Sequence, residues 1–241
     1  MTLAGRVAVV AGATSDVGRA VCLRLAGAGA RLCLLGRDRD SLDLVAKRVR
    51  DVTEGVGAYR VDLSDDADLA TLGERLRRDV DRLDVLVHSA GVFEMAPHAE
   101  AAVGDLDRQY RVNVRGPYRL TQVLLPQLRA QQGQIVFMNS TVGLEARASV
   151  GQYASTQHAL RAVADALRAE VNPDGVRVLT LYLGRTATAR QARIFEREGR
   201  RYAPELLMQP DDVAHMVVAA LTLPRTAEVT EIRMRPLVKS Y

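Results

Sequence analysis

Three polar side chains, Ser140, Tyr153 and Gln157, have types and a spacing that could serve proton transfer. Ser140 ends an apolar run that predicts a buried strand, and Tyr153 opens a stretch with the apolar spacing of a helix. Tyr153 and Gln157 are four residues apart, so they share one face of that helix. Ser140, at the carboxyl end of its strand, can reach the same pocket. Two hydroxyl groups beside a helix-borne amide would suit the donation of a proton to a substrate oxygen.

The elements that would position these residues alternate between strand and helix along the chain. Apolar, β-rich runs predict strands over residues 7–11, 31–35, 58–62, 83–87, 133–140, 176–182 and 229–234. Amphipathic spacing predicts helices over 19–29, 41–50, 69–80, 106–131, 153–171 and 211–221. Pro126 predicts a kink or a late start in its helix, and an Asp cap after Pro210 is expected to open the last one. The alternation predicts one α/β domain over residues 1–241, a Rossmann-type doubly wound parallel sheet of about seven strands with helices on both faces.

Ligands of such sheets bind beyond the carboxyl ends of the strands. The residues that stand out for their type follow predicted strands and converge on that edge: Gly12, Gly36, Asp62, His88, Ser89, Ala90, Gly91, Ser140 and Gly184. The glycines of the turn over residues 12–18 let backbone approach a pyrophosphate at a helix N-terminus, although a tight strand-to-helix turn would use the same glycines. Asp16 lies within that turn, where its carboxylate would face the phosphate charge or cap the helix.

These motifs, in this order, resemble the short-chain dehydrogenase/reductase family over essentially the whole chain. Residues 11–18 resemble its T-G-x-x-x-G-x-G turn with Asp16 in place of the middle glycine. Residues 88–91 resemble N-N-A-G, and residues 183–188 resemble P-G-x-x-x-T. The resemblance implies the following cofactor-binding residues: Gly12, Thr14, Ser15, Asp16, Val17, Gly18, Arg37, Asp62, Leu63, Ser89, Ala90, Gly91, Gly184, Thr186 and Thr188. Of these, Asp62 would contact the adenine or, alternatively, cap the next helix, and Thr186 and Thr188 could bond the nicotinamide amide.

The resemblance also implies which form of the cofactor is used. NAD-selective members carry an acidic residue near position 36 that holds the ribose diol. Gly36 has no carboxylate, and Arg37 could meet a 2′-phosphate instead. NADP(H) is therefore favoured over NAD(H), the alternative being a solvated arginine that opens a charged loop.

Ser140 and Tyr153 match the family's Ser…Tyr-x-x-x-Lys signature, in which Gln157 replaces the lysine. By this resemblance Tyr153 donates a proton to a carbonyl oxygen that Ser140 orients, and Asn113 helps to hold a proton-relay water or has a buried structural role. Gln157 can bond ribose hydroxyls but cannot supply the charge that lowers the pKa of the tyrosine. Arg185 or Arg190 could supply that charge instead.

The function implied is an NADP(H)-dependent oxidoreductase that reduces a ketone or another carbonyl by hydride transfer. The alternative is a degenerate family member without redox activity. Such a protein would serve as a partner subunit of an active homologue, or as a non-redox enzyme of the cyclase or dehydratase kind. The substitutions at Asp16 and Gln157 keep this alternative open.

Composition excludes several other function classes. Apolar residues make up 48% of the chain, and the net charge of +4 is spread among interleaved acids and bases, which does not suggest a nucleic-acid site. The sequence has no tryptophan, and aromatic residues make up only 4%. Its two cysteines and four histidines show no metal-binding spacing. The apolar run over residues 7–11 is too short to cross a membrane, so we expect a cytoplasmic protein. The resemblance implies that its substrate is a small-molecule carbonyl compound.

Two further expectations concern partners. The helices over 106–131 and 153–171 carry apolar residues on more than one face, which predicts a homodimer or homotetramer, or a hetero-oligomer with an active homologue. Alternatively, both faces are covered within the monomer. Residues 185–209 are expected to form a lid over an anionic substrate, because six arginines stand against two glutamates between 185 and 201. The alternative for this segment is a solvated helix whose arginines pair with its own glutamates.

Overall fold

Seven parallel strands form a single sheet in residues 2–238, the part of the chain that this computed structural model describes. Their order is β3-β2-β1-β4-β5-β6-β7. The strands are β1 (Val7–Ala11), β2 (Arg31–Gly36), β3 (Val56–Arg60), β4 (Val85–His88), β5 (Gln134–Ser140), β6 (Arg177–Leu183) and β7 (Glu231–Met234). Because β1 pairs with both β2 and β4, the winding direction of the chain reverses there, which opens a crevice at the carboxyl ends of these strands.

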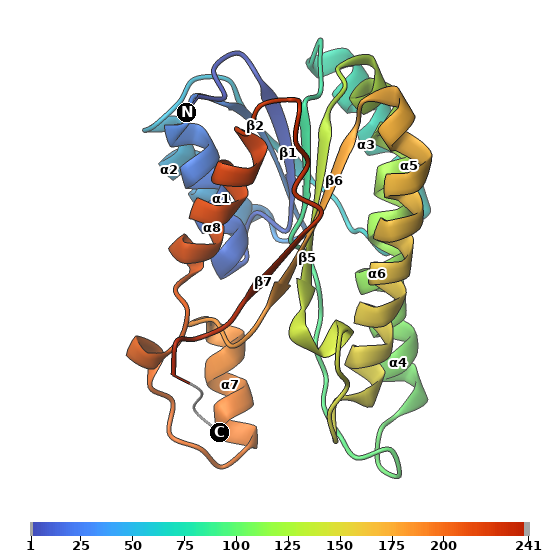
Figure 1. Cartoon of the computed structure of the whole chain (residues 1–241), viewed down its shortest axis with the longest axis vertical. Coiled ribbons are helices and arrows are strands. Elements are labelled where there is room, and N and C mark those ends of the chain that lie inside the picture. The colour runs from blue at the N-terminus through green and yellow to red at the C-terminus, as the bar shows by residue number, and fades with distance from the viewer. Residues whose placement is uncertain (1, 239–241) are drawn as a thin grey trace.

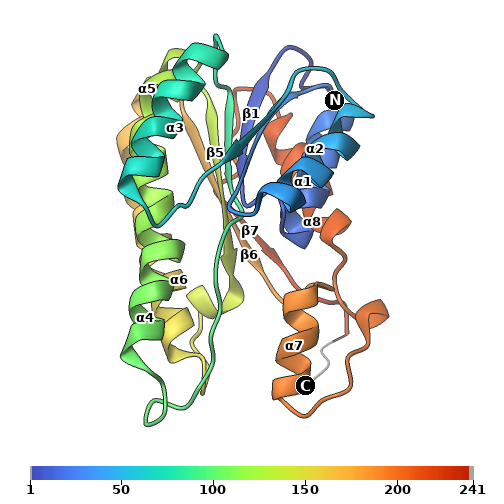
Figure 2. The same cartoon turned by 180° about the vertical axis from the view of Figure 1, so that it is seen from behind.

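Helices cover both faces of the sheet, as predicted (Figures 1 and 2). One layer holds α1 (Asp16–Gly27), α2 (Arg39–Arg50) and α8 (Pro210–Leu221), and the other holds α3 (Asp66–Asp79), α5 (Gly116–Ala130) and α6 (Gly151–Val171). The strands are apolar on both sides: Ala8 and Val10 of β1 face the α1 layer, whereas Val7 and Val9 face the α3 layer. Burial on both faces explains why β1 is a continuous apolar run rather than an alternating one.

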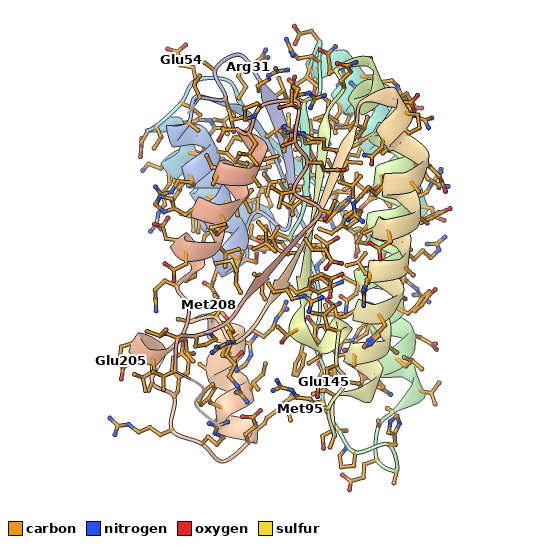
Figure 3. The ribbon with its side chains drawn as sticks, in the orientation of Figure 1. Arg31, Glu54, Met95, Glu145, Glu205 and Met208 are labelled. Atoms are coloured by element: carbon orange, nitrogen blue, oxygen red, sulfur yellow. The ribbon has the colours of Figure 1, made fainter. Side chains whose placement is uncertain are left out.

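The two ends of the sheet differ in what lies beyond them. Figure 3 shows Arg31 and Glu54 at the amino-terminal end of the strands and Met95, Glu145 and Met208 at the carboxyl-terminal end. At that second end, α4 (Val103–Tyr110) extends the α5 and α6 layer past the sheet. The helix α7 (Ala189–Arg197) stands beyond the strands on the side of α8.

The long helix predicted over 106–131 is interrupted. A π-helical turn at Arg111–Arg115 separates α4 from α5. Pro126 lies exposed inside α5, which already begins at Gly116, so the late start predicted at Pro126 is wrong. π-helical turns are rare and frequently lie at functional sites.

The cap predicted for the last helix is also wrong in its details. α8 begins at Pro210, and Gln209 rather than an aspartate is its N-cap. The backbone N–H of Gln209 donates to the carboxylate of Asp212 at 2.7 Å, which forms a reciprocal capping box. Asp211 instead forms an ion pair with Arg24 of α1, and this pair ties the two helices together.

Candidate active site

The turn between β1 and α1 brings a helix N-terminus to the crevice. Gly12 has a φ of +80°, and a Cβ there would lie 2.5 Å from the backbone nitrogen of Ala90, so only glycine fits. Ser15 caps α1 by accepting a hydrogen bond of 3.0 Å from the N–H of Gly18. This cap starts the helix at Asp16, three residues before the predicted start at Arg19.

A pocket of about 220 Å³ lies beside this turn. More than half of the predicted cofactor-binding residues line it: its walls are Gly12, Thr14, Ser15, Leu35, Gly36, Arg37, Val61, Asp62, Leu63, Ala90, Gly91, Val92 and Val112. A Cβ at Gly36 would come within 3.2 Å of the Thr14 methyl group and narrow the pocket. The glycine cradle and the apolar walls fit the adenosine half of a dinucleotide.

Asp62 lies in the wall of this pocket with its carboxylate partly buried. It accepts hydrogen bonds from the Ser64 backbone N–H at 2.9 Å and hydroxyl at 2.7 Å. Although burial raises the pKa of Asp62, these bonds and the charges of Arg37 and Arg60 lower it overall, so the group is ionised at neutral pH. Asp65, not Asp62, caps α3, so the alternative role as a helix cap is wrong.

Asp16 stands where the resemblance places the cofactor's pyrophosphate. Its carboxylate forms an ion pair with Arg19 and accepts a hydrogen bond of 2.9 Å from the N–H of Ala189, the first residue of α7. Because Ser15 is the cap, the expectation that Asp16 itself caps α1 is wrong. The site therefore fits the adenosine half of the cofactor, whereas the fixed negative charge of Asp16 would repel the pyrophosphate.

The proposed proton donor and its partner meet at the end of β5. Ser140 is the last residue of that strand, and Tyr153 lies in the first turn of α6. Loss of water around the phenol raises the pKa of Tyr153, and the positive charge of Arg190 and a hydrogen bond with Ser140 partly offset that rise. The ring of Phe93 packs edge-on against Tyr153, with the two ring centroids 4.9 Å apart.

Asn113 and Gln157 belong to one buried hydrogen-bond network. The Asn113 amide accepts from the Val92 N–H at 2.8 Å and donates to the Val92 carbonyl at 2.9 Å. It also donates to Thr156 Oγ1 at 3.2 Å, to which Gln157 Nε2 donates at 3.4 Å. Asn113 thus has the buried structural role that was the alternative, because it fixes the loop after β4 through both halves of its amide. The side chain of Gln157 is directed to Thr156 and is 4% exposed.

The segment after β6 forms the side of the crevice opposite α6. Thr188 caps α7 by accepting from the Gln191 N–H at 3.1 Å, and Thr186 donates to the Gly184 carbonyl at 3.2 Å. Both hydroxyls that were expected to hold the nicotinamide amide therefore have partners within their own segment. Gly184 packs against β7, its N–H donating to the Met234 carbonyl at 2.8 Å.

The two arginines proposed as replacement cations have different surroundings. One terminal nitrogen of Arg185 donates to both carboxylate oxygens of Glu198 at 2.8 Å, and the guanidinium lies over the ring of Phe195 at 4.6 Å, so its charge is neutralised locally. Arg190 donates a hydrogen bond to the backbone carbonyl of Gly91. The structure thus brings Arg190, and not Arg185, to the same crevice as Tyr153.

The sequence did not single out two residues that shape the site, Phe93 and Thr156. Phe93 lies two residues after the N-N-A-G-like segment, in the loop that follows β4, and an aromatic residue in a loop after a central strand is a usable signal. Thr156 lies next to Gln157, and its hydroxyl joins the Asn113 amide to Gln157. A polar residue on the inner face of an apolar helix would have indicated it.

The predicted oligomer rests on apolar residues that are largely covered within the monomer. Leu120, Leu124 and Leu160 are at most 3% exposed and belong to the core on the α3 side of the sheet. Association stays a prediction. Tyr110 of α4 and Tyr118 of α5 are exposed and could take part in such a contact. Within residues 2–238, no helix is both long and apolar enough to cross a membrane.

Comparison with known proteins places this geometry in a family. The family profile described as short chain dehydrogenase matches residues 6–199. An uncharacterised short-chain type dehydrogenase/reductase of Sinorhizobium fredii is 32% identical over 237 residues, which cover 95% of this chain and 91% of the relative.

Two solved structures match nearly the whole chain. A short chain dehydrogenase from Shigella flexneri 2a complexed with NADP has a TM-score of 0.89 at 28% identity, covering 96% of this chain and 97% of that one. An alcohol dehydrogenase from the archaeon Thermococcus sibiricus complexed with 5-hydroxy-NADP has a TM-score of 0.87 at 26% identity, covering 98% of both chains. The family match and the relative together show that the chain belongs to the short-chain dehydrogenase/reductase family of oxidoreductases.

Proposed function

We propose that this protein is an NADPH-dependent reductase of a carbonyl substrate, in which Tyr153 donates the proton. The observation that carries the proposal is the convergence at one crevice of Ser140, Tyr153 and a pocket that fits the adenosine half of a dinucleotide. Solved relatives bound to NADP support the same cofactor class.

The protonation state of Tyr153 favours reduction over oxidation. Its pKa lies above the ordinary value for a tyrosine because burial disfavours the phenolate. At a pKa of about 10 only about 0.1% of a tyrosine is phenolate at pH 7, and a raised pKa reduces that fraction further. The side chain therefore holds its proton at Oη, as an acid needs, whereas oxidation of an alcohol would require the scarce phenolate as base.

The neighbouring residues have supporting roles in this proposal. The Ser140 hydroxyl lies beside the phenol and orients the substrate oxygen toward it. Phe93 packs edge-on against the Tyr153 ring and helps to keep water from it. Asn113 fixes the loop over residues 91–93 through its bonds to Val92. Bound NADPH would supply the hydride, and the residues that line the pocket would hold its adenosine end.

Arg37 is the basis for the preference for NADPH over NADH. It is exposed at the edge of the pocket, and the position before it is Gly36 rather than an acid. A guanidinium there can bind a 2′-phosphate in a two-armed geometry. A lid role of residues 185–209 toward an anionic substrate stays a prediction, because Arg185, Arg197 and Arg200 already pair with Glu198 or Glu94.

The test is cofactor titration followed by turnover. We expect NADPH to quench or shift the tyrosine fluorescence with a lower Kd than NADH, and a panel of ketones to be reduced by the wild type but not by Tyr153→Phe. Equal affinities would contradict the NADPH preference. If neither dinucleotide binds at millimolar concentration, the reductase is refuted. The remaining assignment would then be the non-redox member, a partner subunit or a cyclase-like enzyme.

A further inference from the structure

Tyr153 lacks the positive neighbour that the family's lysine would provide from α6. Gln157 occupies that position, is 4% exposed and is uncharged. The groups described around the phenol are Ser140 from the end of β5, Phe93 from the loop after β4 and Arg190 from α7. Arg190 is the one charged group of this set.

The position of Arg190 is fixed on both sides of the crevice. Its residue lies in the first turn of α7, directly after Ala189, whose N–H is bound by the Asp16 carboxylate at 2.9 Å. Its guanidinium reaches across to the backbone carbonyl of Gly91. Two residues further along that loop, Phe93 packs against the Tyr153 ring at 4.9 Å. Arg190 therefore spans from α7 to the loop that covers the proton donor.

The charge of Arg190 is not neutralised by its hydrogen bond, since a carbonyl oxygen carries no net charge. Three other arginines of the segment differ, because they pair with acidic side chains. Arg185 and Arg200 pair with Glu198, and Arg197 pairs with Glu94 at 3.1 Å. Arg193 is exposed.

Resting on the proposed function, we propose that Arg190 supplies from α7 the positive charge that the family's lysine supplies from α6. It acts as an electrostatic positioning residue on Tyr153. When hydride adds to the carbonyl carbon and the phenol gives its proton to the carbonyl oxygen, a phenolate remains at Tyr153 Oη. The guanidinium stabilises that anion. Because it stays charged at every working pH, it neither gains nor loses a proton in the reaction. The network of Gln157 with Thr156 then serves positioning alone.

A readout that needs no cofactor is the titration of Tyr153 by nuclear magnetic resonance of tyrosines labelled at Cζ. The chain has seven tyrosines, and Tyr153→Phe identifies the signal of interest by its loss. A positive charge within about 4–6 Å lowers the pKa of an acidic group by about 1–3 units. We expect Arg190→Gln to raise the pKa of Tyr153 by about one unit, Arg190→Lys to restore most of the shift, and Arg193→Gln, on the same helix, to leave the titration unchanged.

Rescue gives the second measurement. Gln157→Lys in the Arg190→Gln background is expected to lower the pKa of Tyr153 again, and by more than Gln157→Lys does alone, because the wild-type site already has one cation. The pH profile of ketone reduction should move in the same direction, with kcat of Arg190→Gln reduced about tenfold and KM little changed, since one pKa unit corresponds to a factor of ten.

The outcomes separate this proposal from the reductase itself. An unchanged Tyr153 titration in folded Arg190→Gln overturns the role of Arg190 even where NADPH reduces ketones normally. A shifted titration without NADPH binding or turnover supports the electrostatic role and refutes the reductase. If Arg190→Gln fails to fold, the comparison of Gln157→Lys with the wild type decides. A new lysine should lower the pKa of Tyr153 by about two units or more only where the wild-type phenol has no cation beside it, so a drop of that size contradicts the proposal.

Discussion

The carboxylate of Asp16, in the first turn of α1, accepts a 2.9 Å hydrogen bond from the N–H of Ala189, in the first turn of α7. The two helix N-termini on either side of the crevice are thereby joined through one acidic side chain. The same carboxylate sits where the family's cofactor turn carries a glycine. Its effects on charge and on the placement of α7 can be separated by mutation.

Asp16→Asn is expected to tighten NADPH binding about tenfold. Two unit charges about 4 Å apart near a protein surface interact by about 4 kcal/mol, of which salt and solvent leave a part. The asparagine oxygen can still accept from Ala189, so the variant removes the charge and keeps the tie to α7. The measurement is the Kd for NADPH by calorimetry at low and at high salt. The gain in affinity of the variant over the wild type should shrink as the salt concentration increases.

A matched control is Asp40→Asn, in the first turn of α2, which is exposed and is not among the residues that line the pocket. It is expected to leave the NADPH affinity unchanged. Weaker or unaltered binding by Asp16→Asn would mean that the carboxylate does not face a phosphate, and that the cofactor lies elsewhere in the crevice.

Arg37→Gln should weaken NADPH and leave NADH unaffected. A charge-assisted hydrogen bond contributes about 1.5–3 kcal/mol, which corresponds to a loss of about tenfold to a hundredfold in affinity. Arg39→Gln is the control, because Arg39 lies two residues away and pairs with Asp43 at 2.9 Å on the surface of α2. Parallel losses for both dinucleotides would assign Arg37 to the fold of the loop rather than to the 2′-phosphate.

Gln157→Lys should raise turnover, and more for alcohol oxidation than for ketone reduction. The added cation lowers the pKa of Tyr153 and so increases the small phenolate fraction that oxidation requires. Initial rates in both directions, at saturating cofactor, give the ratio. The control is Gln152→Lys at the start of the same helix, which adds a charge bonded to the carbonyl of Ala102 outside the crevice. Rates that stay level or fall in both directions would show a pocket adapted to other chemistry.

His88 makes stability depend on pH. Its ring stacks on Phe137 with centroids 4.7 Å apart, Nε2 lies 2.9 Å from Thr121 Oγ1, and Nδ1 has no partner among the described residues. Burial lowers its pKa from 6.5 to about 3. Between these values the unfolded chain binds the proton and the folded chain does not, so the free energy of unfolding falls as the pH falls, by up to about 1.4 kcal/mol per pH unit.

His88→Gln is expected to flatten this part of the profile. Denaturant unfolding at several pH values below 6.5 measures the slope for the wild type and the variant. The exposed residue His98 provides the comparison, since His98→Gln should keep the wild-type slope. A His88→Gln slope equal to that of the wild type would show that His88 is protonated in the folded protein.

The sheet was predictable because burial on both faces leaves an unambiguous signal. Residues 7–11 are wholly apolar, and every predicted strand is present within two residues of its expected bounds. β3 lies two residues earlier than predicted, and β4 and β7 start two residues later. Helix starts were less well predicted. α1 begins three residues earlier than predicted because Ser15 is its N-cap. Several polar residues of the turn could have served as the cap, so the sequence did not identify it.

Side-chain partners could not be read from the sequence, because they depend on contacts between distant segments. The sequence correctly placed Ser140 at the end of its strand and Tyr153 at the start of its helix. By contrast, the bonds of Asn113 to Val92 and of Asp16 to Ala189 join residues whose separation in the chain hides them. The π-helical turn at Arg111–Arg115 left no recognisable mark, since its residues have ordinary helix propensities.

The attachment of α7 has a consequence for the time course of binding. Ala189, Arg190 and Arg197 tie this helix to Asp16, Gly91 and Glu94, all at the rim of the crevice. We expect a dinucleotide to seat its phosphates beside Asp16 only after the first of these bonds breaks. Association would then wait for α7 to lift, and the observed rate would level off with rising ligand concentration, as in enzymes whose loops open more slowly than ligands arrive.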